Sequence, residues 1–80
     1  MRIDKFLKNA RIIKRRPVAK EACDGGRVKI NGKTAKAGDE VKVGDVFEVA
    51  FGENTFRGEV LDTSDNVSKK DAQTLYKTLS

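Results

Sequence analysis

The segment from residue 14 to residue 32, KRRPVAKEACDGGRVKING, restricts the fold of this 80-residue chain more than any other part of it. Its proline, Pro17, is tolerated in the first turn of a helix and disfavoured in the interior, so a helix is predicted to begin at Arg16 or Pro17. The pair Gly25-Gly26 provides the left-handed backbone conformation in which helices commonly end. The sequence therefore predicts a short helix that is bounded on both sides.

The residues that follow, RVKING at positions 27–32, alternate between cationic and apolar side chains. Val28 and Ile30 fall on one face and the two cations on the other, a pattern typical of a half-buried strand. The Asn31-Gly32 dipeptide is a strong signal for a tight hairpin turn, because both residue types accept positive φ angles. A strand that ends in a tight turn is predicted directly after the helix.

Another helix is predicted ahead of this segment, because apolar residues recur at helical spacing near the N-terminus. They form one stripe, made of Ile3, Phe6, Leu7, Ala10 and Ile13. Asp4 lies in the first turn, where a carboxylate complements the helix dipole. Asn9 is a weak helix former, and the helix is expected to break near it.

The middle of the chain is predicted to form strands joined by turns. Residues 33–45 carry turn residues and little periodicity, which indicates an irregular connection with one weak strand at 41–43. Residues 46–51 and 55–60 show the alternation of half-buried strands, and Gly58 inside the second of them indicates a bulge or close packing. The phenylalanines of the chain occupy apolar registers and are expected in the core: Phe6, Phe47, Phe51 and Phe56.

The C-terminal part is predicted to be a polar linker and a helix, which divides the chain into a domain at residues 1–61 and a tail at residues 62–80. Ser68 and Asp71 resemble a capping box. The apolar residues after them have the spacing of a helical stripe: Ala72, Leu75, Tyr76 and Leu79. This helix either packs back on the small core or fits a groove of a partner protein. The predicted fold class is α+β, with two short helices, a small antiparallel sheet and a C-terminal helix.

Positive charge is concentrated near the N-terminus. The chain has a formal net charge of +5, but its first twenty residues carry eight lysines and arginines against one acid, Asp4. A segregated array of cations suits a polyanionic partner, because its phosphates release their counterions on binding. The alternative is a solvated basic face that keeps the chain soluble, and such a face would carry interspersed acids.

The composition argues against several other classes of protein. One cysteine and no histidine leave no internal disulfide, no zinc site and no Ser-His or Cys-His nucleophile pair, and Cys23 is expected to be a small buried hydrophobe. Asp39, Glu40 and Asp45 could bind a divalent cation, but they are expected to be turn and loop residues. No enzyme activity, cofactor or metal is expected. No apolar run approaches the roughly 20 residues of a membrane span, and no secretory signal is evident, so a cytoplasmic protein without membrane contact is expected.

The cations, the helix start and the turn are expected to form one binding site. A helix N-terminus offers backbone N–H groups and a favourable dipole to a phosphate, and arginine offers it a planar fork. The sequence shows no exposed aromatic platform and no long recognition helix, which favours folded RNA over single strands and DNA. The predicted RNA-binding residues are Arg2, Lys5, Lys8, Arg11, Lys14, Arg15, Arg16, Lys20, Arg27, Lys29, Asn31 and Gly32.

Three stretches resemble, in order and spacing, the S4-like RNA-binding domain, also called the alpha-L motif: RIDKFL at 2–7, the segment 14–32 and VKVGDVFEV at 41–49. The resemblance covers roughly residues 2–50, and it implies that two helices and the following strand and turn bind structured RNA. By position it assigns this role to Arg2, Lys5, Arg16, Arg27, Lys29, Asn31 and Gly32. Arg15 and Pro17 depart from the family pattern of Thr or Ser before the arginine and Ser or Ala after it, so a conventional N-cap hydroxyl is missing.

The remaining residues leave no room for a catalytic domain, and the chain is similar to the small stand-alone bacterial members of this class, the RqcP-like proteins and the S4-type heat-shock proteins. The resemblance implies three partners: large-subunit ribosomal RNA, the peptidyl-tRNA of a stalled large subunit, and an RqcH-type factor that adds a C-terminal alanine tail to the stalled chain. The implied role is in ribosome quality control. The alternatives are a heat-shock-type factor without a role in tailing and an adaptor that recruits a partner through its C-terminal helix. A monomer is expected.

Overall fold

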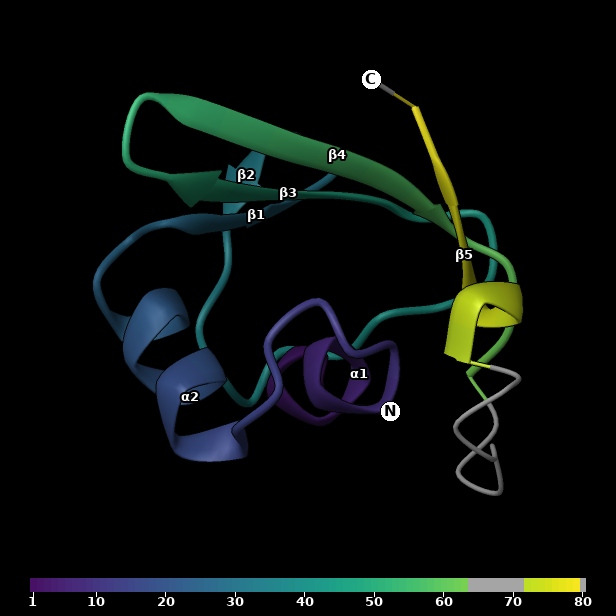
Figure 1. Ribbon diagram of the computed structural model, residues 1–80, viewed down its shortest axis with the longest axis horizontal. Coiled ribbons are helices and arrows are strands. Elements are labelled where there is room, and N and C mark those ends of the chain that lie inside the picture. The colour runs from purple at the N-terminus through teal and green to yellow at the C-terminus, as the bar shows by residue number, and fades with distance from the viewer. Residues whose placement is uncertain (64–71, 80) are drawn as a thin grey trace.

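The computed structural model describes residues 1–63 and 72–79 (Figure 1). Two helices precede a five-stranded antiparallel sheet with strand order β2-β1-β3-β4-β5, and the helices lie against one face of the sheet. The elements are α1 (Ile3–Asn9), α2 (Arg16–Asp24), β1 (Val28–Ile30), β2 (Lys33–Thr34), β3 (Val46–Phe51), β4 (Asn54–Val60), a 3-10 turn η1 (Ala72–Leu75) and β5 (Tyr76–Thr78). The prediction of an α+β fold with two short helices and an antiparallel sheet is confirmed.

The helix boundaries follow the local signals in the sequence. α1 ends at Asn9, and α2 begins at Arg16 with its proline in the first turn. Gly26 has a φ of 76° directly after α2, the left-handed conformation expected there. Asn31 and Gly32 have φ angles of 51° and 83°, which is the geometry of a type I′ turn, and this turn joins β1 to β2.

The core lies between the helices and the inner face of the sheet, and Phe47 on β3 is at its centre. The Phe47 ring is fully buried, and its centroid lies 5.4 Å from that of Phe6 and 6.2 Å from that of Tyr76, both in T-shaped geometry. Gly58 lies opposite Phe47 across β3 and β4. A Cβ on Gly58 would come within 2.6 Å of the Phe47 ring, and the pairing on either side is continuous, so this glycine marks close packing and not a bulge.

Two large apolar residues are not in the core, and one of them, Phe51, was predicted to be there. Phe51 is 46% exposed and Val18 is 47% exposed. Phe51 has the same register as Phe47 and Val49, but it lies at the end of the β3–β4 hairpin. Val18 lies one turn before the buried Ala22, on the same side of α2. Alternation and helical spacing predict the direction of a side chain, whereas burial also requires a neighbour at that place.

The weak strand predicted at residues 41–43 is wrong. This part of the chain runs past the start of α1, where the backbone N–H of Ile3 donates to the carbonyl of Asp39 (2.7 Å) and the N–H of Val41 donates to the carbonyl of Met1 (2.9 Å). The connection therefore satisfies backbone groups that would otherwise be unpaired at the helix start. Val41 is buried there, and Val43 is 64% exposed.

The predicted C-terminal helix is wrong within residues 72–79, where the chain forms η1 and then β5, which pairs with β4. Leu75 is fully buried and Tyr76 packs against the core, so the i, i+3 spacing that indicated a helix is satisfied by one short turn followed by a strand. The inference that this segment packs back on the domain is confirmed for Leu75. The capping box proposed at Ser68 and Asp71 lies outside the described residues.

Cys23 is a buried structural side chain, as predicted. It is 2% exposed, and burial raises the pKa of its thiol to about 11, with nearby carboxylates, Asp4 first among them, adding to the shift. The thiol therefore stays protonated and unreactive at neutral pH.

Candidate nucleic-acid interface

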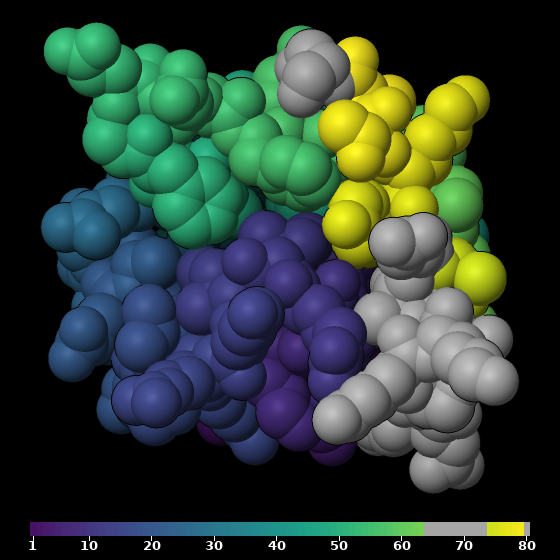
Figure 2. Space-filling view, viewed as in Figure 1, coloured from purple at the N-terminus to yellow at the C-terminus, as the bar shows by residue number. Residues whose placement is uncertain are grey.

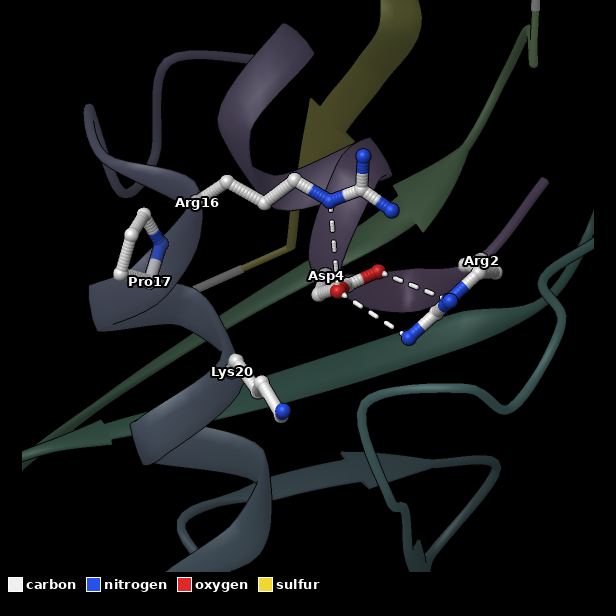
Figure 3. Close-up of a pocket in the computed structure, with 5 residues that line it drawn as sticks. All are labelled: Arg2, Asp4, Arg16, Pro17 and Lys20. Carbon is white, nitrogen blue, oxygen red and sulfur yellow. Dashed lines mark hydrogen bonds and ion pairs between the residues drawn. The ribbon is translucent and has the colours of Figure 1, made fainter.

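A buried carboxylate joins the two helices at their basic ends. Asp4 lies in the first turn of α1, and its side chain is only 3% exposed. Its Oδ1 is 3.4 Å from Nε of Arg2, and its Oδ2 is 3.4 Å from Nε of Arg16, the first residue of α2. The two guanidinium groups approach this one carboxylate from different elements (Figure 3). Asp4 thus fixes the separation of two arginines that are fourteen positions apart in the chain.

The two arginines border an open cavity of about 440 Å³, lined by Arg2, Asp4, Arg16, Pro17 and Lys20. Arg2 and Arg16 keep 50% and 45% of their side chains exposed, so each is held at one end and presented to solvent at the other. Lys20 lies one turn along α2 and adds a third cation beside the same hollow (Figure 3). Three cations around one carboxylate leave the cavity positively charged, which suits an anion of two or more negative oxygens.

The start of α2 strengthens this preference. Arg15 occupies the N-cap position in an extended conformation, and no side chain caps the helix. The first turn contains no acidic residue. Its backbone N–H groups and the positive end of the helix dipole therefore act together with the Arg16 side chain, and both favour a phosphate.

The connection between the helices contains a strained arginine. Arg11 has a φ of 60°, a conformation that favours glycine, and it follows the last turn of α1 in a Schellman arrangement. The N–H of Arg11 donates to the carbonyl of Lys8 (3.0 Å), and the N–H of Ile12 donates to that of Leu7 (3.1 Å). An exposed arginine at a position that favours glycine does not stabilise the fold, which indicates that its charge has a role in binding.

Replacing Arg11 with glycine is expected to stabilise the protein by about 1 kcal/mol, because glycine adopts this backbone conformation without a steric cost. The same change removes a cation from the connection and is expected to weaken RNA binding. Urea denaturation measures the first effect, and a titration with a folded RNA measures the second. A glycine variant that is no more stable than the wild type would contradict the assignment of strain.

The remaining predicted residues that precede β1 fall into three groups. Lys8, Lys14 and Arg15 are exposed and belong to α1 and the connection, and these segments lie on the helical side of the sheet (Figure 1). Lys5 is partly buried beside Asp4, and its backbone N–H donates to Asp4 Oδ1 (2.8 Å). Arg27, just before β1, lies apart from the cavity and lines a second groove.

Lys29, Asn31 and Gly32 do not join the arginine cavity. Lys29 points away from the buried Val28, so it lies on the sheet face opposite to the helices, in register with Glu48. The amide of Asn31 is used within the fold: Nδ2 donates to Asp45 Oδ1 (3.1 Å), and Oδ1 accepts from the N–H of Val46 (2.9 Å). Gly32 serves the left-handed position of the turn. The strand and turn are therefore a scaffold next to the cavity and not one of its walls.

Sequence reasoning missed the role of Asp4, which it assigned only to the helix dipole. The available signal was its isolation: it is the sole acid among twenty residues that carry eight cations. A lone carboxylate in such a segment, two residues after an arginine, is expected to have a specific cationic partner.

Asp39 and Asp45 are turn residues, as expected, whereas Glu40 forms an isolated antiparallel bridge with Arg2. Asp39 accepts a hydrogen bond from the N–H of Lys36 (3.0 Å), and Asp45 accepts one from the N–H of Lys42 (2.8 Å), so each carboxylate closes its own turn. Within residues 1–63 and 72–79, no three metal-binding side chains come together. In the same ranges, no helix is both long enough and apolar enough to cross a bilayer.

Comparison with known proteins identifies relatives of this chain. The model of the S4 domain family matches residues 1–47. The chain is 48% identical to the RQC P-site tRNA stabilizing factor of Halalkalibacterium halodurans, covering 96% of this chain and 88% of that protein, and 48% identical to the factor of the same name from Streptococcus pneumoniae, covering 100% and 91%. Its fold is similar to the trimeric structure of Vibrio cholerae Heat Shock Protein 15, with a TM-score of 0.89, 31% identity and coverage of 100% and 82%.

Proposed function

The chain belongs to the S4 domain family, and on this premise we propose that it is a non-catalytic RNA-binding protein that acts on the large ribosomal subunit and its tRNA in ribosome quality control. The observation that carries the proposal is the pair of half-exposed arginines, Arg2 and Arg16, held by the buried Asp4 at the start of α2. Two fixed guanidinium groups beside a helix N-terminus match the spaced phosphates of a folded RNA backbone.

The finer parts of the proposal rest on the relatives. They are named as factors that stabilise P-site tRNA, and the identity extends over nearly the whole of this chain. We infer that the chain contacts large-subunit ribosomal RNA and peptidyl-tRNA, and that it assists an RqcH-type factor in alanine tailing. We also propose a cytoplasmic monomer that carries out no chemistry itself. The predicted RNA-binding residues of the helices and their connection, Arg2 and Arg16 foremost, remain the proposed contact surface, whereas Lys29, Asn31 and Gly32 lie outside it.

One alternative has an observation in its favour. The fold matches Heat Shock Protein 15 over the whole of this chain, which supports a factor that binds stalled large subunits without a role in tailing. The adaptor hypothesis has less support, because the stripe that was to recruit a partner contains the fully buried Leu75, although Leu79 is 40% exposed. Alanine tails assayed in cells that lack the protein separate tailing from binding alone: tails shorten or disappear only if the protein assists the tailing factor.

Replacing Arg16 with alanine is expected to weaken binding to large subunits about tenfold to hundredfold, because one charge-assisted contact to a phosphate is lost. Arg2→Ala is expected to have a smaller effect, since Arg2 lies beside the N-terminus of α1 and not that of α2. Co-sedimentation with purified large subunits that carry peptidyl-tRNA, at increasing salt, gives the affinities and the salt slope.

Arg57→Ala is the matched control. Arg57 is 48% exposed, pairs with Glu48 (Nε to Oε1, 3.5 Å) and lies on the opposite face of the sheet. Replacing it with alanine therefore removes the same charge as Arg16→Ala does, but from the other side of the molecule. If Arg57→Ala weakens binding as much as Arg16→Ala does, net charge drives association and the proposed cavity plays no special part.

A further inference from the structure

A second groove lies on the other side of α2 from the arginine cavity. It has a volume of about 210 Å³ and is bounded by the α1–α2 connection, α2 and the end of β3. Most of its lining is apolar and comes from Ile12, Ile13, Val18, Ala22, Val49 and Phe51, with Glu21 and Arg27 also among the lining residues. The end of the β3–β4 hairpin and α2 lie at the same end of the molecule (Figure 1), and on the face shown in Figure 2 the green hairpin segment meets the blue helical segment.

Two large apolar side chains contribute exposed surface to this groove, and one of them, Phe51, was predicted to lie in the core. Phe51 and Val18 are each nearly half exposed, from β3 on one side and α2 on the other. Phe51 follows the inward register of its strand, so its ring faces the helical side of the sheet beyond the point where the core ends. An aromatic ring held at the end of a short hairpin beside an aliphatic wall is a ready stacking surface.

Charged groups complete the chemistry of the groove. Arg27 offers a planar guanidinium that can stack on a ring or donate hydrogen bonds, and Glu21 offers a carboxylate that can accept them from an exocyclic amine. The groove is smaller than the 300–1,000 Å³ or so of most small-molecule sites, and its size suits a single flat ring system.

The residues around the groove indicate which kind of flat ring system it binds. Ile12 and Ile13 belong to the α1–α2 connection, whose other members include Arg11, Lys14 and Arg15, all exposed. A ligand in the groove therefore lies within an array of cations that continues over the start of α2 to Arg16. A flat apolar ring joined to negative charges on either side is a nucleotide of an RNA strand.

We propose that this groove takes one unstacked nucleobase of the bound RNA, stacked on Phe51, while the flanking phosphates contact the connection and the start of α2. This inference rests on the proposed function and adds a base-binding subsite to a surface otherwise made for phosphates. Such a subsite prefers RNA with an extruded base, in a loop or a bulge, over a continuous duplex.

The test replaces Phe51 with alanine, leucine and tryptophan and measures affinity for large subunits that carry peptidyl-tRNA over a series of salt concentrations. Phe51→Ala is expected to weaken binding about fivefold to hundredfold with an unchanged salt slope, because stacking releases no counterions. Phe51→Trp is expected to retain wild-type affinity, and Phe51→Leu, which keeps apolar area without a π face, is expected to bind as weakly as the alanine variant. Val43→Ala is the control, because Val43 is an apolar residue that is 64% exposed and does not line the groove.

Each outcome has one interpretation. If Phe51→Leu binds as well as the wild type, the groove holds an aliphatic or protein ligand and the nucleobase is excluded; unchanged binding of Phe51→Ala also overturns the inference. If the wild type itself fails to bind large subunits, the proposed function fails, a result distinct from failure of the groove alone. Ultraviolet crosslinking of the wild-type complex provides a second readout, in which the peptide that contains Phe51 is expected to carry a nucleotide adduct.

Discussion

The variant that lacks both Arg2 and Arg16, each replaced by alanine, is expected to lose measurable binding to large subunits and about 2–3 kcal/mol of its free energy of unfolding. The loss of binding follows from removing both guanidinium groups beside the cavity. The loss of stability follows from Asp4, whose carboxylate is 3% exposed and would be left in the protein without either cation. Both arginines are about half exposed, which keeps the expected cost below that of a fully buried ion pair.

A third substitution separates the two effects. Adding Asp4→Asn removes the unpaired charge while the amide oxygen can still accept the N–H of Lys5, so most of the lost stability is expected to return. Binding is expected to remain absent, because the phosphate contacts are still missing. Urea denaturation and co-sedimentation of both variants measure this. A triple variant that regains binding would show that the arginines act only through the fold.

Replacing Phe47 with alanine is expected to lower the free energy of unfolding by about 3–5 kcal/mol, the largest effect on stability of any single change considered. The ring is fully buried and lies within 6.2 Å, centroid to centroid, of Phe6, Phe56 and Tyr76, so its removal leaves a cavity that three other rings border. A chain of this size has roughly 4–12 kcal/mol to lose, and the variant is expected to unfold near physiological temperature. Thermal unfolding monitored by circular dichroism measures the shift.

Gly58 provides an internal check on this packing. Gly58→Ala alone is expected to cost about 1–3 kcal/mol, because its Cβ would lie 2.6 Å from a ring atom of Phe47 and 3.3 Å from the Lys77 carbonyl oxygen. In the Phe47→Leu background the smaller side chain leaves room, and the same change is expected to cost much less. A double-mutant cycle with no coupling between positions 47 and 58 would contradict the close contact.

Local signals in the sequence were enough to predict α1, α2, the Asn31-Gly32 turn and the fold class. Pro17 marks the start of α2 because its ring fixes φ and it cannot lie in a helix interior. Gly26 ends α2, and Asn31-Gly32 forms its turn, because these residues accept the positive φ angles required there. The apolar stripe of α1 is fully buried because a helix beside a sheet has a neighbour along its whole length.

Features that depend on distant parts of the chain were not predictable in this way. β5 forms because one edge of β4 has backbone groups that are available to pair with the C-terminal segment. The sequence of the C-terminal segment alone does not show that such an edge is present. Phe51 has a core register but projects past the helices that would cover it. In the candidate site, the concentration of cations was evident, but the separation of Lys29 from Arg16 arises from the alternation of β1 within an assembled sheet.

The order of strands also affects how copies of this protein behave beside one another. The longest strands, β3 and β4, lie inside the sheet, and its two borders are β2, two residues long, and β5, three residues long. Each border strand carries an exposed lysine, Lys33 or Lys77. A neighbouring chain therefore finds too little open backbone, and too much charge, to add a strand, which protects a basic protein from polymerising when many copies crowd together.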